Sequence, residues 1–172
     1  YTVELRRHAL AETIHYSTRI EGNTLTLEQV QSLLAGETIR APQGQVQEVQ
    51  NYREALSYIY SLVEGSARIM EDTIRTIHYL VTKSLPSDYS PGLYRTVQNY
   101  VVDSVTDRRV FMPPAPEDVP RLMQEFVEWL NQKNELPATF RAALAHLNLV
   151  AIHPFSDSNG RTARVLDSLV MY

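Results

Sequence analysis

The chain has 172 residues, enough for one domain with a buried core, and 44% of them are hydrophobic and 21% charged, as in ordinary soluble globular proteins. Its 16 basic and 20 acidic residues give a formal net charge of −4, which argues against nucleic acid as the main partner. The chain has no cysteine, and this excludes disulfides, thiol nucleophiles and zinc–thiolate sites.

The sequence shows no sign of membrane insertion or export. No apolar run approaches the roughly 20 residues that span a bilayer, and no signal peptide is visible. We therefore expect a cytoplasmic protein with no membrane partner. The chain starts at Tyr1 without a methionine and stops inside an apolar stretch at Tyr172, so we expect both ends to be trimmed. Whether a targeting segment has been lost therefore stays an open question.

Helical periodicity dominates the first part of the chain. Apolar residues three and four apart predict a helix from about residue 3 to residue 20, which Gly22 interrupts. Thr26 and Gln29 have the spacing of a capping box and predict that a short helix begins there. A longer apolar stripe then predicts a helix over about residues 46–64.

The second part adds more helices and one different segment. Apolar stripes predict helices over about 70–85, 119–130 and 140–152, and a last helix from about Gly160. In the segment TVQNYVVDSVTDRRVF, residues 96–111, β-branched and aromatic residues flank a polar, turn-like stretch, which predicts a β-hairpin. We find no repeat and no linker between domains. The prediction is a single all-α domain over residues 1–172 with one hairpin.

The twelve residues HPFSDSNGRTAR, numbers 153–164, gather several kinds of reactive side chain. Because Pro154 disfavours helical geometry at the residue before it, we expect a helix to end at about His153. Phe155 is apolar and is expected to anchor the loop in the core. The loop then turns through Gly160 into the last helix.

These residue types suit the binding of a nucleotide. The N-terminus of a helix presents unpaired N–H groups and a partial positive charge, which together attract anions. Arg161 and Arg164, one turn apart, add donor forks suited to phosphate oxygens. Asp157 offers a hard oxygen ligand for Mg²⁺ beside that anion site. His153 is neutral near pH 7 in its ordinary state and can accept a proton from a hydroxyl group.

Taken singly, each residue has a plainer explanation. A histidine at a helix end is more often a cap or a surface residue, arginines in a first turn often serve solubility, and a loop aspartate often makes a turn. His146, His153 and Asp157 as a metal site would rest on weak spacing, and we expect His8, His15, His78 and His146 to be core or cap residues. Only the combination favours a site for phosphoryl-type transfer.

The stretch HPFSDSNGRTAR resembles the signature of the Fic (filamentation induced by cAMP) family, His-x-Phe-x-Asp/Glu-Gly-Asn-Gly-Arg-x-x-Arg. The resemblance extends to the segments STRIEGNTLTLEQV (17–30), GLYRTVQNYV (92–101), FMPPAPEDV (111–119) and FRAALAHLNLVAIHPF (140–155), and thus to nearly the whole chain. It implies the Fic-type helical bundle, with residues 96–111 as a flap.

The resemblance also implies an activity, because Fic enzymes typically transfer AMP from ATP to a Ser, Thr or Tyr hydroxyl of a target protein. It implies His153 as the general base and Asp157 as the ligand of Mg²⁺. The residues implied in nucleotide binding are Ser158, Asn159, Gly160, Arg161 and Arg164, with Arg161 at the β- and γ-phosphates and Arg164 at the γ-phosphate. Those implied in pairing with an extended target segment are Val97, Gln98, Asn99 and Tyr100.

Ser158 is the one departure from the signature, since the family has glycine at this position. If the backbone there needs a positive φ, serine costs on the order of 1 kcal/mol or crowds the phosphates. The serine hydroxyl could equally serve as an extra donor. The sequence leaves these alternatives open.

Residues 17–22, Ser-Thr-Arg-Ile-Glu-Gly, match the family's inhibitory pattern Ser/Thr-x-x-x-Glu-Gly/Asn. The match resembles the subclass whose inhibitory helix, here about 2–22, precedes the catalytic motif. Glu21 paired with Arg164 would take the guanidinium group that should hold the γ-phosphate, and Ser17, four residues before Glu21, would steady the turn. The plainer alternative is a solvated Glu21 at a helix end.

Two other functions stay open from the sequence. One is a Fic-fold enzyme that transfers a different phosphate-containing group, and the other is a protein-binding module with a degenerate site. The resemblance is also compatible with the reverse removal of AMP and with a homodimer, although the sequence indicates no interface.

Overall fold

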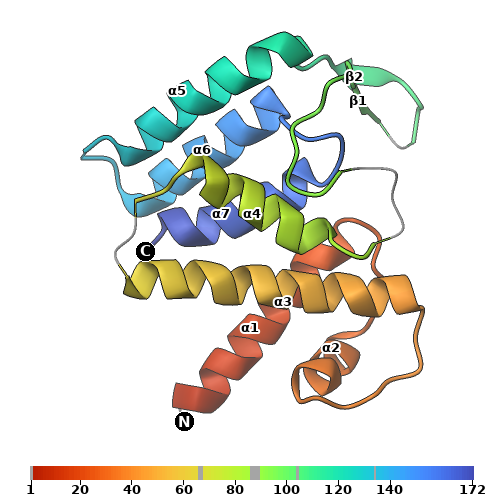
Figure 1. Cartoon of the computed structure of the whole chain (residues 1–172). Helices are drawn as coiled ribbons and strands as arrows, with labels where there is room; N and C mark the ends of the chain where they lie inside the picture. Colours follow the sequence, from red (N-terminus) through yellow and green to blue (C-terminus); the bar gives the residue numbers. More distant parts are fainter. Residues whose placement is uncertain (1, 66–67, 86–89, 104, 134) are drawn as a thin grey trace.

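The helix α3 (Gln43–Glu64) runs through the middle of the molecule, in a computed structural model that describes residues 2–65, 68–85, 90–103, 105–133 and 135–172. In Figure 1 α2 (Leu27–Leu34) lies below α3, and α1 (Thr2–Arg19) begins below α3 and crosses it. The group above α3 is α4 (Glu71–Thr82), α5 (Val119–Asn131), α6 (Ala138–Ile152) and α7 (Asn159–Val170), with a short 3₁₀ helix, η1 (Pro116–Asp118), before α5.

Helix α7 occupies the centre of the upper group. It packs against α6, α3 and α4 and also touches α1. Thr162, Ala163, Val165 and Leu166, which cover more than one face of this helix, are fully buried. A helix that is apolar on several faces is enclosed by its neighbours rather than laid on a surface. The residues at its N-terminus are therefore held in a fixed place relative to α1, α3, α4 and α6.

Every α-helix in the described chain contributes to one hydrophobic core. The contributions include Ile14, Val30, Tyr52, Ile77, Met123, Leu149 and Leu166. The predicted capping box is present, since Thr26 Oγ1 accepts from the Gln29 N–H at 3.3 Å and the Gln29 side chain accepts from the Thr26 N–H at 2.9 Å. The prediction of an all-α fold with one hairpin is confirmed. The first predicted helix, about 3–20, agrees with α1 to within one residue at each end, whereas the inhibitory helix implied over about 2–22 already ends at Arg19, before Glu21.

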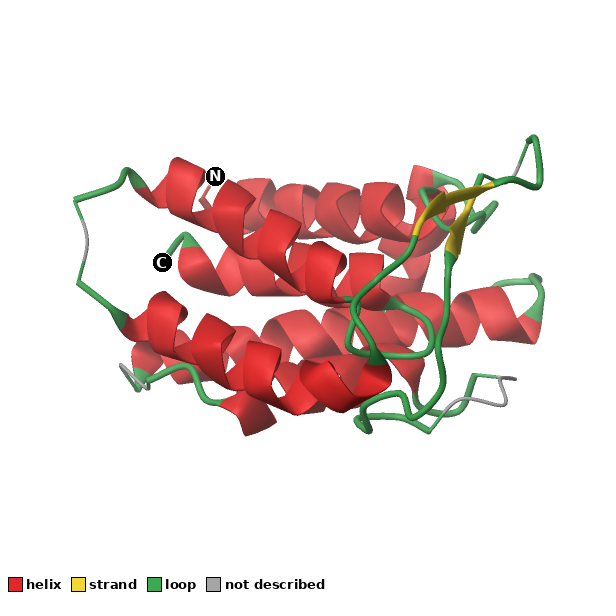
Figure 2. Ribbon diagram, turned by 90° about the horizontal axis from the view of Figure 1, so that it is seen from above, coloured by secondary structure: helices red, strands yellow, loops and turns green. Residues whose placement is uncertain are grey.

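The hairpin is also shorter than predicted (Figure 2). Strands β1 (Val101–Val102) and β2 (Arg109–Phe111) pair antiparallel with an irregular register, while residues 96–100 lie outside the strands. In this limb Gln98 donates to the carbonyl of Pro113, and Asn99 donates to that of Phe155. The polar side chains tie the limb to nearby loops, and periodicity alone could not show that these bonds replace a longer ladder.

No helix among the described residues is long and apolar enough to cross a membrane.

Two leucines in α6 lie on opposite sides of the boundary of the core, since Leu149 is fully buried at 0% exposure and Leu147 is 63% exposed.

We expect Leu149→Ala to lower the free energy of unfolding by about 2–5 kcal/mol, because it removes buried methyl groups and leaves a cavity. Leu147→Ala is the matched control and should change it by less than about 0.5 kcal/mol. Denaturant unfolding of both variants measures the difference. Equal losses would contradict the assignment of the buried face of α6.

Candidate active site

The loop between α6 and α7 begins and ends on a residue with left-handed backbone geometry. His153, directly after α6, has φ 51° and ψ 57°, and Ser158, directly before α7, has φ 59° and ψ 18°. The end of α6 at Ile152 agrees with the expectation from Pro154. The chain therefore turns sharply where it leaves α6 and again where it enters α7.

Asn159 closes this loop through its side chain. Its Oδ1 accepts from the Phe155 N–H at 3.0 Å, and its Nδ2 donates to the Phe155 carbonyl at 2.9 Å. Asn99 Nδ2 donates to the same carbonyl at 3.2 Å. Phe155 is fully buried, as predicted. The side chains of Asn159 and Asn99 therefore brace the loop, and their expected places at the nucleotide and at the target segment stay predictions.

The imidazole of His153 has one nitrogen held and one available. Its Nδ1 lies 3.3 Å from the carbonyl of Val150, so this nitrogen carries the proton and Nε2 is left as an acceptor. Burial lowers the pKa of His153 below its ordinary value of 6.5, and the nearby Arg95 charge lowers it further. The ring is thus held neutral near pH 7, as a general base requires.

Arg95 connects the predicted flap, residues 96–111, to the loop between α6 and α7. Sequence reasoning missed this role. The side chain is 3% exposed, and it donates to the carbonyls of His153, Val97 and Pro114 at 2.7, 3.3 and 2.6 Å. Val97 and Pro114 belong to opposite limbs around the hairpin. The position of His153 is therefore coupled to both limbs.

The predicted brake residues meet the predicted phosphate arginine. Arg164 Nη2 lies 2.6 Å from Glu21 Oε1 and 3.0 Å from the carbonyl of Ser17. Ser17 thus contacts Arg164 through its backbone. A β-carbon at Gly160 would lie 3.2 Å from Arg164 Nη1 and 3.3 Å from Glu21 Oε1, so no larger residue fits without a shift. The Glu21 carboxylate consequently lies against the first turn of α7, where an anion is favoured.

Arg161 is paired within the protein rather than open to solvent. Its Nη1 lies 2.6 Å from Glu48 Oε1, and its Nη2 donates to Ser158 Oγ at 2.6 Å. Glu48 also accepts from Asn23 Nδ2 at 2.9 Å. Glu48, on α3, therefore links the turn that carries Glu21 to the arginine of the last helix. Nothing in the spacing of the sequence pointed to this residue.

Asp157 is the acidic residue of the loop between α6 and α7. Its side chain is 52% exposed, with Oδ2 3.9 Å from Arg161 Nη2, while Oδ1 accepts from the Ser158 N–H at 2.6 Å. Within the described ranges no group of three or more His, Asp or Glu could form a metal cage. A single exposed carboxylate fits Mg²⁺, which proteins usually bind through one or two carboxylates together with substrate phosphates and waters. His146 is bonded to Asp167 at 2.7 Å, which gives no support to the alternative site with His153 and Asp157.

A groove of about 610 Å³ runs between the flap and α6. Its lining residues are Gln98, Phe111, Met112, Pro113, Pro114, Ala115, Leu122, Asn148, Ala151 and Ile152. Ile152, the residue before His153, places one end of the groove at the C-terminus of α6. Of the predicted target-binding residues, Val97 is exposed and Tyr100 lies under the Arg109 guanidinium at 3.9 Å.

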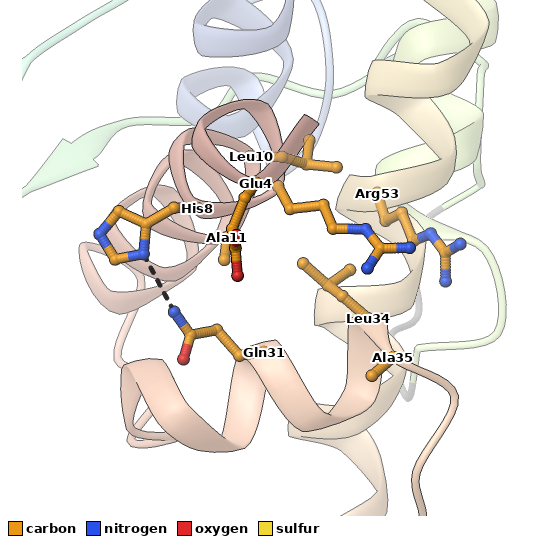
Figure 3. A pocket seen from close by; sticks show the side chains of 9 residues that line it. Glu4, His8, Leu10, Ala11, Gln31, Leu34, Ala35 and Arg53 are labelled. Carbon is orange, nitrogen blue, oxygen red and sulfur yellow. Dashed lines mark hydrogen bonds between the residues drawn. The ribbon is translucent and has the colours of Figure 1, made fainter. Parts of the chain in front are cut away.

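A second hollow of about 500 Å³ lies between α1, α2 and α3 (Figure 3). Leu10, Ala11 and Leu34 form its apolar side, and Gln31 Nε2 lies 3.2 Å from His8 Nδ1 at its edge. The lining includes no predicted site residue. The predicted chemistry therefore gathers at the junction of α6 and α7, and this hollow stands apart from it.

Comparison with known families agrees with the motif at this junction. Residues 68–171 match the family described as the Fic/DOC family. The chain belongs to the Fic/DOC family.

Relatives of this Fic domain carry one name. "Protein adenylyltransferase Fic" from Nematostella vectensis is 39% identical over 173 residues, 96% of this chain and 38% of the relative. The protein of that name from Drosophila grimshawi is 38% identical over 167 residues, 94% of this chain and 32% of the relative. The chain thus spans about a third of the length of these curated relatives.

Solved Fic structures share the fold. A Fic domain containing signaling protein from Bacteroides thetaiotaomicron superposes with a TM-score of 0.87 at 31% identity, covering 99% of this chain and 66% of that one. Fic-1 from C. elegans gives a TM-score of 0.82 at 31% identity, covering 99% of this chain and 51% of that one. At these identities the match shows common architecture along nearly the whole Fic domain.

Ser158 combines a strained backbone with a useful hydroxyl in this Fic domain. Its φ of 59° is a conformation that favours glycine, and its Oγ holds Arg161. We expect Ser158→Gly to be more stable than Ser158→Ala by about 1 kcal/mol, because both lose the hydroxyl and only glycine relieves the backbone. Thermal and denaturant unfolding of the two variants test this. An alanine variant as stable as the glycine variant would contradict left-handed geometry at this position.

Proposed function

We propose that the domain is an autoinhibited protein adenylyltransferase, which transfers AMP from ATP to a Ser, Thr or Tyr hydroxyl of a target protein. The observation that carries the proposal is the Glu21 carboxylate, which is bonded to Arg164 and lies against Gly160 at the N-terminus of α7. A carboxylate at this place occupies the position that suits a phosphate. The names of the relatives indicate the reaction.

His153 supplies the base in this reaction. Its free Nε2 takes the proton of the target hydroxyl while the hydroxyl oxygen attacks the α-phosphorus of ATP. A new bond forms between that oxygen and the α-phosphorus, and the bond from the α-phosphorus to the β-phosphate bridging oxygen breaks. Pyrophosphate leaves with the electron pair. The Val150 carbonyl keeps the ring in the tautomer that can accept this proton.

The start of α7 supplies the phosphate cradle. The N–H groups of Asn159, Gly160 and Arg161 belong to the first turn of the helix, whose amides have no partners within the helix. Arg164 holds the γ-phosphate once Glu21 has left it. Arg161 reaches the β- and γ-phosphates when its bond to Ser158 Oγ gives way.

Asp157 would hold Mg²⁺ in this proposal, and the ion would supply positive charge to neutralise the phosphate oxygens. The target segment lies along the flap, where Val97 and Tyr100 are exposed and where the groove between the flap and α6 includes Gln98 in its lining. A cytoplasmic location, a homodimer and the lack of a nucleic-acid partner remain predictions from the sequence.

Glu21→Gly should raise transfer of AMP to target or to the protein itself by on the order of tenfold to a hundredfold, because it frees Arg164 to orient the triphosphate and small misplacements are costly. Incorporation of labelled AMP in the presence of Mg²⁺ measures the change. Glu37→Gly, which alters an exposed loop glutamate, is the matched control and should have no effect. A Glu21→Gly protein no more active than the parent would contradict the proposed inhibition by Glu21.

The activity of the Glu21→Gly protein should stay constant on lowering the pH to about 6.5 and fall only below it. Protonated His153 cannot act as a base, and its lowered pKa moves the acid limb below the ordinary value of 6.5. Measurement of kcat/KM between pH 5 and 8, at about half-unit steps, tests this.

In the Glu21→Gly background, His153→Ala should lower the rate of AMP transfer by about 100-fold or more. A variant that keeps the parent rate would show that another group takes the proton.

A further inference from the structure

His78, on α4, contacts the backbone of two separate loops with its two ring nitrogens. The side chain is 1% exposed. Its Nδ1 accepts from the Gly92 N–H at 2.9 Å, and its Nε2 lies 3.2 Å from the carbonyl oxygen of Asp157. A backbone N–H can only donate, so Nδ1 carries no hydrogen and Nε2 donates to Asp157. The tautomer is therefore set by the fold.

The same ring supports the middle of the catalytic loop. It stacks on Phe155 with ring centroids 3.7 Å apart and planes 4° from parallel. Phe155 lies halfway between His153 and Asp157. One side chain thus holds the loop both at its centre and at the residue proposed to hold Mg²⁺.

Gly92 makes the other end of this support rigid. It has φ +75°, and a β-carbon there would come within 3.2 Å of the Arg75 carbonyl and 3.3 Å of Tyr79 Cβ. The Gly92 carbonyl accepts from Arg75 Nε at 2.9 Å. Since Arg75 and Tyr79 are on α4 with His78, the Gly92 N–H that donates to Nδ1 cannot shift without moving that helix.

We propose that His78 is a positioning residue, whose Nε2–H holds the Asp157 carbonyl so that the Asp157 carboxylate stays aimed at the Mg²⁺ of the bound nucleotide. The inference rests on the proposed function. Asp157 is only partly supported otherwise, since half of its side chain is exposed and its nearest cation, Arg161 Nη2, is 3.9 Å away. Loss of the bond from His78 releases the peptide that carries this carboxylate, and such supporting partners typically change metal affinity by 10-fold or more.

Two amide side chains separate this role from simple core packing. The amide nitrogen of glutamine reaches the place of Nε2 and can donate to Asp157, whereas asparagine reaches only the place of Nδ1 and can keep only the Gly92 bond. His78→Gln and His78→Asn each lose the ring over Phe155 and one hydrogen bond, so we expect similar losses of stability. His78→Leu makes neither bond and takes the place of His78→Asn should that variant not fold.

The experiment measures metal binding directly in the Glu21→Gly protein, by titration of Mn²⁺ with a non-hydrolysable ATP analogue followed by electron paramagnetic resonance. Mn²⁺ accepts the same oxygen ligands as Mg²⁺. His78→Asn and His78→Leu should raise the half-saturating Mn²⁺ concentration about tenfold, and His78→Gln should stay within about threefold of the parent. The Mg²⁺ dependence of AMP transfer should shift in the same order.

Equal shifts in the glutamine and asparagine variants, or changes in thermal stability alone, would overturn the role of His78 and leave adenylyl transfer intact. A parent that binds Mn²⁺ with the analogue but transfers no AMP would overturn the proposed reaction alone. A parent that binds no Mn²⁺ with the analogue would overturn both.

Discussion

The two hydrogen bonds between the Asn159 side chain and the backbone of Phe155 are the constraint on which the site depends. They close the loop between α6 and α7 while the Phe155 ring is buried in the core. With the loop closed, its end residues His153 and Ser158 both take left-handed geometry. This geometry turns the chain sharply at each end of the loop, so that the first amides of α7 start at a defined place. The packing of α7 among α3, α4 and α6 then holds that place within the fold.

Both arginines of the site are paired with a carboxylate. Arg164 pairs with Glu21 and Arg161 pairs with Glu48, and a partly buried guanidinium without such a partner would be costly. In the proposed function a nucleotide enters by exchange, with phosphate oxygens taking the place of protein oxygens. Because Asn23 connects Glu48 to the turn after α1, the two ion pairs are joined through one short segment. The proposed inhibitory contact and the proposed phosphate site thus share one network of side chains.

The sequence predicted much of this because its strongest signals are local. Helical periodicity, the Thr26 capping box and the effect of Pro154 on His153 each depend on neighbours in the chain, and the structure confirms them. Glu21 and Arg164 also meet as expected. The roles of Glu48, Arg95 and His78 could not be predicted, since their partners between His153 and Arg161 lie 58 to 113 residues away. The bracing bonds of Asn99 and Asn159 to Phe155 were missed because an amide that braces a loop has no sequence signal of its own.

A crystal structure of the Glu21→Gly protein with Mg²⁺ and a non-hydrolysable ATP analogue is the most direct test of the proposed triphosphate site beside the imidazole of His153. The account predicts phosphates on the amides of Asn159 to Arg161, the terminal phosphate at Arg164, and the α-phosphorus facing His153 Nε2. A nucleotide bound elsewhere, such as the hollow between α1 and α2, would contradict it. So would an imidazole that points away from the bound phosphates.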